Sequence, residues 1–417
     1  MNEKIKKTII ILVVILIFGA ISVGVYLGMG KAKNVTVPGQ SSSGGGVSSF
    51  PVSSGSGAQS SSGMTNVGSQ QNQLNTANPP VGDQAYQAQK SRLFQLATHQ
   101  TIGFWVASST TSSPSGILRA LVYYINPNGD VVLIQDVGRE QTIAASSFGT
   151  PLHVWQSPNG LMAVVSFDSG TYALFDVKTK AWKVLPDGVK SVAFAPSGRS
   201  LAMLKESGGQ TAISIMNLSL ASKAISPLVS FAAVDLTLLW PSPNNLLLLS
   251  RPSSVVDGQA WLIDVSTKTF LNIAHGNGLQ IVTSQKNPYH LVAYTATNGG
   301  PVQIKILSIS GDVAATIPFE TVADKCVFGT KDSELVCAVP YQNDSGSSID
   351  ILSSYLERGV YFHDVVYRIW GDKFSTISPL LTAPDISIDV VYPRVIGSQL
   401  FFLNRLDGTV YLYNLSS

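Results

Sequence analysis

The sequence has little charge and almost no cysteine. Only 12% of its 417 residues are charged, against about 25% in an average soluble protein, while 45% are hydrophobic. This composition excludes a disordered polyelectrolyte, and the length allows a large buried core. The two cysteines exclude a disulfide framework and a metal site made of four thiolates.

Basic residues are scarce beyond the N-terminus. Five of the 27 Lys and Arg residues and one of the 25 acidic residues lie within 1–33, which leaves 22 basic and 24 acidic residues for the rest. A surface that binds duplex nucleic acid needs clustered Lys and Arg to displace counterions from phosphate. We therefore expect no nucleic-acid partner.

Common catalytic motifs are also missing. The sequence contains no G-x-S-x-G nucleophile elbow, no H-E-x-x-H, no P-loop and no G-x-G-x-x-G that opens a helix. We expect no cofactor and no metal, and an enzymatic role has no support from motifs.

One long hydrophobic run is present near the N-terminus. Residues 8–28 contain no charge, and 21 residues of helix span about 31 Å, the thickness of the bilayer's hydrocarbon core. Three lysines precede the run, whereas no Lys or Arg occurs between Lys33 and Lys90. The positive-inside rule then predicts a single-pass cell-membrane protein with residues 1–33 as cytoplasmic tip and span, and the remainder outside the cytoplasm. A cleaved signal peptide is the alternative.

A linker is expected from 34 to 89. Ser and Gly supply 17 of the 23 residues from Ser41 to Gly63, and Asp83 is the only charge in the linker. Such a segment buries too little apolar surface to offset its chain entropy, so it should be disordered.

The remainder, 90–417, repeats a unit of four short apolar runs separated by turn residues. The clearest copies span Val154–Leu185, Ala193–Ile225 and Leu239–Ile273, and weaker copies span Ser284–Ile317 and Phe328–Ile377. Four strands per repeat of this length predict an all-β fold, a β-propeller.

The ends of this region predict how the ring closes. The last copy, 386–415, has only three strands. Residues 91–97 resemble the fourth strand of a repeat, but no first three strands precede them. We expect these segments to pair in one sheet, which removes open edges. Counting first strands near Thr101, Pro151, Val189, Leu236, Leu279, Val322 and Ile386 predicts seven blades.

Three turns carry a family resemblance. WQSPNGLMAVV at Trp155, FAPSGRSLAML at Phe194 and WPSPNNLLLL at Trp240 resemble the W-S-P-D-G-x-x-I-A pattern of WD-repeat-like propellers of the TolB type. Asn or Ser stands where that pattern usually has Asp. The resemblance implies a bacterial protein that binds peptides or proteins in the cell envelope, although some proteins of this architecture are hydrolases.

Candidate binding residues lie between repeats. Ligands of propellers bind at the face formed by the loops that join the fourth strand to the next first strand and the second strand to the third. His99, Asp187, His275 and Asp385 are expected in such loops, where they would bind a cation or act as acid and base, or would simply face water.

An insertion at 342–359 carries helix signals. Ser348 is placed as an N-cap and Gly359 follows the helix end. The expected helix presents an apolar face that packs either on the propeller or on a partner protein. The residues assigned to partner contact are Ile351, Leu352, Tyr355, Leu356 and Arg358.

Cys326 and Cys337 flank a predicted hairpin turn and should face each other across neighbouring strands. Outside the cytoplasm they would form a disulfide, and the alternative is two buried thiols.

Together these features predict a membrane-tethered propeller that serves as a binding or scaffolding module of the envelope. The alternatives are a propeller hydrolase or lyase with an acid/base site, and a subunit of an envelope or pilus assembly that is recruited through the 351–358 helix.

Overall fold

The structure is a computed structural model that describes residues 83–415. Within that range it leaves out 110–111, 220–223, 285, 296–300, 332, 342–351, 353–354, 356, 358–359 and 383–385. The predicted span at 8–28 and most of the predicted linker therefore lie outside the described residues. Of the helices in the described part, none has the length and apolar composition to cross a membrane.

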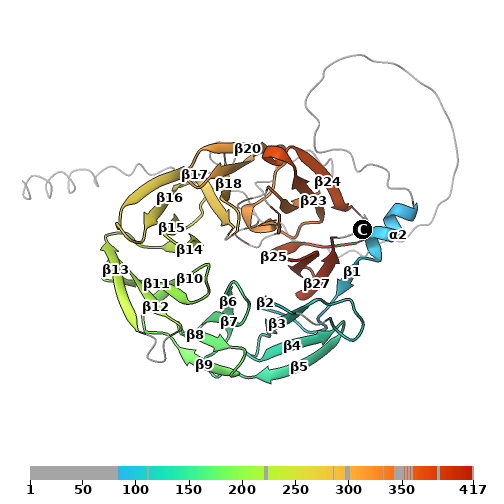
Figure 1. Ribbon diagram of the computed structural model, residues 1–417, viewed down its shortest axis with the longest axis horizontal. Helices are drawn as coiled ribbons and strands as arrows, with labels where there is room; N and C mark the ends of the chain where they lie inside the picture. The colour runs from blue at the N-terminus through green and yellow to red at the C-terminus, as the bar shows by residue number, and fades with distance from the viewer. Residues whose placement is uncertain are drawn as a thin grey trace, which may run out of the picture. The chain divides into compact units, whose positions relative to one another are not determined.

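Antiparallel sheets built from strands that neighbour one another in sequence make up the fold (Figure 1). Three four-stranded sheets come first. Their strands are β2 (Gly103–Ser108), β3 (Ala120–Ile125), β4 (Val131–Asp136) and β5 (Arg139–Ala144); β6 (Pro151–Gln156), β7 (Met162–Phe167), β8 (Tyr172–Asp176) and β9 (Ala181–Val184); and β10 (Val189–Phe194), β11 (Ser200–Ser207), β12 (Gln210–Asn217) and β13 (Ile225–Phe231).

A seven-stranded sheet follows. Its strands are β14 (Leu236–Ser242), β15 (Asn245–Ser250), β16 (Asp257–Asp264), β17 (Phe270–Thr283), β18 (Tyr289–Thr295), β19 (Val302–Ser308) and β20 (Val313–Ile317). The long strand β17 pairs with β16 up to Asn277 and with β18 from there onward. The prediction of an interblade loop around His275 is thus wrong, because the chain continues there as a strand.

Two further four-stranded sheets complete the architecture. One follows the 3-10 turn η1 (Ala323–Lys325), carries a second such turn, η2 (Asp372–Phe374), and contains β21 (Cys326–Phe328), β22 (Leu335–Pro340), β23 (Asp364–Trp370) and β24 (Thr376–Leu381). The other joins β25 (Val390–Ile396), β26 (Gln399–Asn404) and β27 (Thr409–Asn414) to β1 (Leu93–Gln95) from the start of the described chain.

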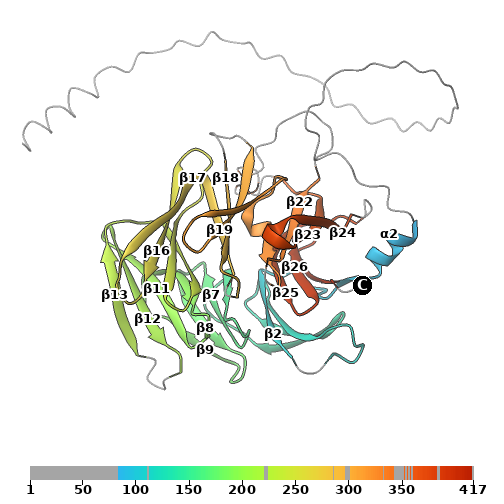
Figure 2. The same cartoon turned by 45° about the horizontal axis from the view of Figure 1, so that its top comes forward.

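The sheet of β25, β26, β27 and β1 unites the two ends of the described chain. Phe94 lies opposite Leu412 in an antiparallel ladder, and Leu96 N continues it by donating to Val410 O at 2.8 Å. This is the pairing expected between 91–97 and the last repeat. The sheets together have the architecture of a β-propeller (Figure 2). The strands β25, β2, β6, β10 and β14 lie towards its centre (Figure 1).

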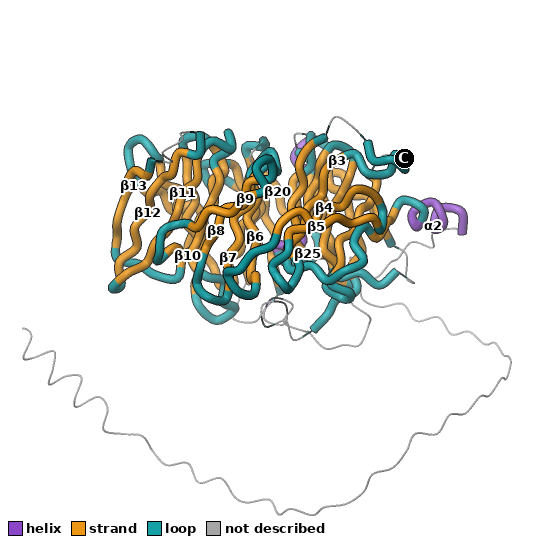
Figure 3. Tube along the Cα trace, turned by 90° about the horizontal axis from the view of Figure 1, so that it is seen from below, coloured by secondary structure: helices purple, strands orange, loops and turns teal. Residues whose placement is uncertain are grey.

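The core lies between neighbouring sheets. Phe104 and Val122 of one sheet pack with Phe401 and Leu412 of the next. A middle strand such as β26 is buried at every position because sheets cover both of its faces, which explains why its sequence is continuously apolar. Outer strands such as β9 are mostly exposed. Figure 3 shows the strands, in orange, from a direction at 90° to that of Figure 1.

The end of the predicted linker is folded rather than disordered. Residues 83–90 form helix α2 (Asp83–Lys90), whose Gln89 Oε1 accepts a hydrogen bond from Thr382 N at 3.1 Å. Ala and Gln favour helix, and the contact with the chain after β24 orders a segment that composition alone assigned to the linker.

Candidate functional site

Four charged side chains converge where η1 meets the strand β25. Lys325 Nζ donates to Asp364 Oδ2 and Asp389 Oδ1, each at 2.6 Å, and to Val390 O at 3.1 Å. An ammonium has three donors, so Lys325 is satisfied. The side chains of Lys325, Asp364 and Asp389 are completely buried. Burial raises the pKa of Asp364, although Lys325 acts in the opposite direction.

Arg405 extends this network towards the surface. Its Nε lies 3.5 Å from Asp389 Oδ2, and its Nη2 donates to Val360 O at 3.0 Å. Asp389 Oδ2 also accepts from Phe362 N at 3.1 Å. The network thus anchors the segment that follows the 342–359 insertion. Its charges neutralise one another, which suits a structural role better than catalysis.

Two described residues of the insertion pack on the propeller itself. Leu352 and Tyr355 are helical, but Leu352 is only 1% exposed and belongs to the core that includes Leu291 and Phe328. Tyr355 packs against two core clusters, with Arg405 Cζ 5.6 Å from its ring centroid. The prediction that Leu352 contacts a partner is therefore wrong, because its side chain is buried in the propeller's own core, and Tyr355 is partly buried against the same core. Ile351, Leu356 and Arg358 lie outside the described residues.

Sequence reasoning missed the Lys325 network. Lys325 is separated by 39 residues from Asp364 and by 64 from Asp389, and no motif connects them. Only the folding of neighbouring sheets brings them together.

The structure pairs His99 with a carboxylate that the sequence did not single out. Glu140 Oε2 lies 2.5 Å from His99 Nδ1 and accepts from Tyr124 Oη at 3.0 Å, while Glu140 Oε1 accepts from Thr98 N at 2.6 Å. Burial alone would raise the pKa of Glu140, but these hydrogen bonds outweigh it and lower the pKa. The imidazole is 73% exposed, so its other nitrogen can reach a ligand.

The other predicted site residues do not join His99. His275 lies within β17, with Nδ1 3.8 Å from Asp257 Oδ1. Asp187 is exposed in the loop between β9 and β10, and Asp385 lies outside the described residues. His99 lies next to Glu140 and His275 lies next to Asp257. No described contact links the predicted residues into one site.

Cys326 and Cys337 lie opposite each other in the ladder of β21 and β22. They are joined by a disulfide, the first of the two alternatives that the sequence left open. Among the described residues, no group of three His, Cys, Asp or Glu side chains is placed to hold a metal ion.

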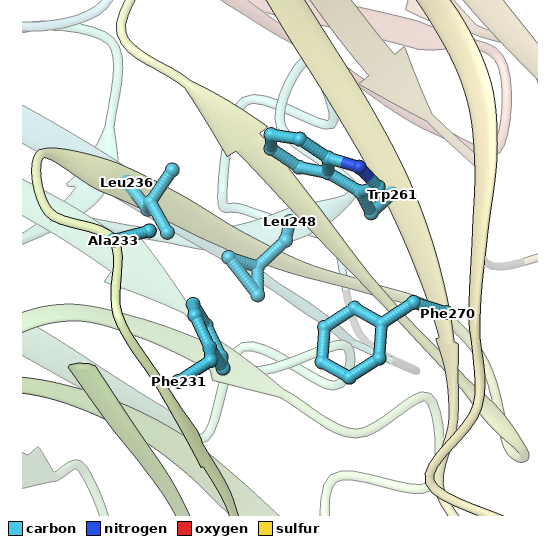
Figure 4. A pocket seen from close by; sticks show the side chains of 6 residues that line it. All are labelled: Phe231, Ala233, Leu236, Leu248, Trp261 and Phe270. Atoms are coloured by element: carbon cyan, nitrogen blue, oxygen red, sulfur yellow. The ribbon is translucent and has the colours of Figure 1, made fainter. Parts of the chain in front are cut away.

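An apolar groove lies between the third sheet and the seven-stranded sheet (Figure 4). Its volume is about 320 Å³. The rings of Phe231 and Phe270 meet edge to face at a centroid distance of 5.6 Å, and Phe270 is 44% exposed. The lining contains only apolar and aromatic residues: Phe231, Ala233, Leu236, Leu248, Trp261 and Phe270. The sequence shows no signal for this groove because its residues come from five strands, β13 to β17, and the loop between β13 and β14.

Comparisons with known proteins support the fold. The chain is similar to a chain in the mitotic checkpoint complex, with a TM-score of 0.51 and 12% identity over 84% of this chain and 100% of that one. It is similar to oligogalacturonate lyase from Vibrio parahaemolyticus, with a TM-score of 0.51 and 10% identity over 78% of this chain and 94% of that one. It is similar to TolB from Acinetobacter baumannii, with a TM-score of 0.40 and 12% identity over 66% of this chain and 62% of that one.

The two likenesses above 0.5 show a β-propeller fold. They show the fold alone, because one fold hosts many functions. No protein-family model matches the sequence, and no curated protein matches it.

Proposed function

We propose that this chain is a seven-bladed, membrane-tethered propeller whose head binds a protein partner of a bacterial cell envelope. The blade count follows if β17 is divided at Asn277, where its pairing passes from β16 to β18. The tether and the extracytoplasmic location rest on the apolar run 8–28 and on the distribution of Lys and Arg.

The groove between β13 and β17 carries this proposal. An open hollow lined entirely by aromatic and aliphatic side chains offers no group for acid/base work, whereas it suits an apolar side chain of another protein. Val234, 53% exposed, adjoins its lining in sequence. The partner we assign is an envelope protein that inserts an aromatic or leucine side chain into the groove, against the Phe231 and Phe270 rings.

A matched pair of variants tests this role. Phe270→Asp places a charge in the groove, while Leu271→Asp changes the next residue, which is 52% exposed and does not line the groove. Full-length protein is cross-linked in membranes of its host and captured. We expect one cross-linked protein to be lost in Phe270→Asp and retained in Leu271→Asp. Identical partners in both variants would remove the groove from the proposal.

A second candidate function is that of a hydrolase or lyase, favoured by the contact between His99 and Glu140. A carboxylate that holds Nδ1 fixes the tautomer and leaves Nε2 free to move a proton. Activity towards a panel of ester and polysaccharide substrates should then disappear in His99→Gln and persist in His275→Gln. Equal activity of the two variants would count against this function.

A further inference from the structure

Among the described residues, Arg394 differs from Lys325, Arg368 and Arg405 in having no carboxylate partner. Lys325 and Arg405 share Asp389, and Arg368 Nη2 lies 2.6 Å from Glu334 Oε1. Arg394 is partly buried, and its Nε is buried without a hydrogen-bond partner. Within the described part of the chain, no hydrogen bond or ion pair engages its guanidinium.

A β-bulge determines where this part of β25 lies. The pairing with β26 changes between Val391, opposite Leu403, and Arg394, opposite Phe401, so two residues of β25 face one of β26. Tyr392 in this bulge has φ of 53°, a left-handed conformation that non-glycine residues adopt at a cost. Bulges of this kind redirect side chains, often beside functional sites.

The redirected Tyr392 reaches towards another sheet. Its ring centroid lies 5.7 Å from that of His153 on β6, and the rings are nearly perpendicular. The His153 ring also lies 4.3 Å from that of Trp155. Both β25 and β6 are inner strands (Figure 1). Arg394 therefore follows an aromatic contact between two inner strands.

Leaving a guanidinium partly desolvated and unpaired is unfavourable. Burial lowers the pKa of Arg394, and Tyr392 acts in the opposite direction. An apolar residue in this position would avoid the cost of removing the charge from water. A polar group that remains unsatisfied in the fold is instead explained when a ligand supplies the missing acceptor.

A carboxylate fits this position better than a phosphate. The planar guanidinium matches a carboxylate with two parallel hydrogen bonds, and one positive charge balances one negative charge. Phosphate, with its larger charge, is usually held by several cations or by backbone N–H groups. We propose that Arg394, which follows the contact of Tyr392 with His153 along the chain, forms a site for a carboxylate group of a ligand. This site is separate from the groove and does not depend on it.

The test measures thermal stability of the full-length protein with four probes, each at about 10 mM, a concentration high enough to occupy a weak binding site. The probes are acetyl-Ala-Leu-Ala, its C-terminal amide, glucuronate and inorganic phosphate. We expect a carboxylate probe to raise the Tm by roughly 2 °C or more. The amide should have no effect. Arg394→Gln should abolish the shift, and Arg251→Gln, at an exposed arginine, should retain it.

Each outcome bears on the proposal. A response to the peptide acid alone identifies a peptide terminus, and a response to glucuronate alone identifies a sugar acid. No response to either acid, an equal response to acid and amide, a response to phosphate only, or a full response in Arg394→Gln would overturn it. Without ligand, Arg394→Leu should raise the Tm, whereas a fall of several degrees would show a structural role. Because the groove is tested by partner capture, the two proposals fail separately.

Discussion

Lys325 Nζ lies 2.6 Å from Asp389 Oδ1, and this ion pair crosses from the turn before β21 to the residue before β25. It joins two neighbouring sheets at their inner strands. Because Asp389 also accepts from Phe362 N, the same carboxylate fixes the chain after the insertion.

Lys325→Met should destabilise the protein strongly. The substitution removes the only ion-pair partner of Asp364 among the described residues and one of the two partners of Asp389, both of them buried, which costs about 3–5 kcal/mol. Chemical denaturation at pH 7 measures the loss, and Arg251→Met, in an exposed pair separated by 3.8 Å, should change stability little. The deficit of Lys325→Met should shrink in acid, because Asp364, whose pKa is raised by burial, takes up a proton there. Equal stability of the two variants at pH 7 would contradict the role assigned to the network.

His290 should make stability depend on pH. It is 1% exposed, and neither ring nitrogen has a hydrogen-bond partner among the described residues. Burial lowers its pKa from 6.5 to about 4. The unfolded chain therefore binds a proton that the folded chain rejects, so stability falls as the pH drops from 6.5 towards 4, by up to about 3 kcal/mol.

Denaturation curves from pH 7 to pH 4 test the contribution of His290. In His290→Leu the dependence on pH should become shallower, whereas His275→Gln, at a histidine whose side chain is 75% exposed, should match the wild type. An unchanged slope in His290→Leu would show that other groups cause the acid sensitivity.

Gly160 and Gly198 provide a matched test of the repeated turn. Both have positive φ, 67° and 69°, but a Cβ on Gly160 would overlap Val106 O and the Ala107 backbone, whereas one on Gly198 has 3.7 Å to its nearest neighbour. Gly198→Ala should cost about 1 kcal/mol from backbone strain. Gly160→Ala should cost about 3 kcal/mol, because overpacking adds to strain. Similar losses of Tm would contradict the close approach of the two sheets.

The disulfide between Cys326 and Cys337 should add measurable stability. It closes a loop with a sequence separation of 11, for which chain entropy predicts about 3 kcal/mol. The double substitution Cys326→Ala/Cys337→Ala should lower the Tm accordingly. Intact mass with and without reductant, after alkylation, tests the bond directly. Alkylation of both thiols without reductant in freshly isolated protein would show that the bond is absent.

The sequence by itself determined the repeating all-β architecture. Turn residues and apolar strands recur along the chain, and every sheet except the one that contains β1 forms from strands adjacent in sequence, so local patterns suffice to predict them. The missing strand of the last repeat also predicted the pairing of Phe94 with the end of the chain. The expected loop at His275 failed because β17 bends from one set of partners to the next without a break in strand pairing.

Only the tertiary structure decided which side chains meet. Lys325 and Asp389 lie 64 residues apart, and Tyr392 reaches His153 from another sheet. Such contacts depend on how sheets pack around the centre and on a bulge that no local pattern announces. The same holds for Leu352, since periodicity showed an apolar face but not what covers it. Folding buried Leu352 in the propeller's own core, because removing apolar surface from water is favourable.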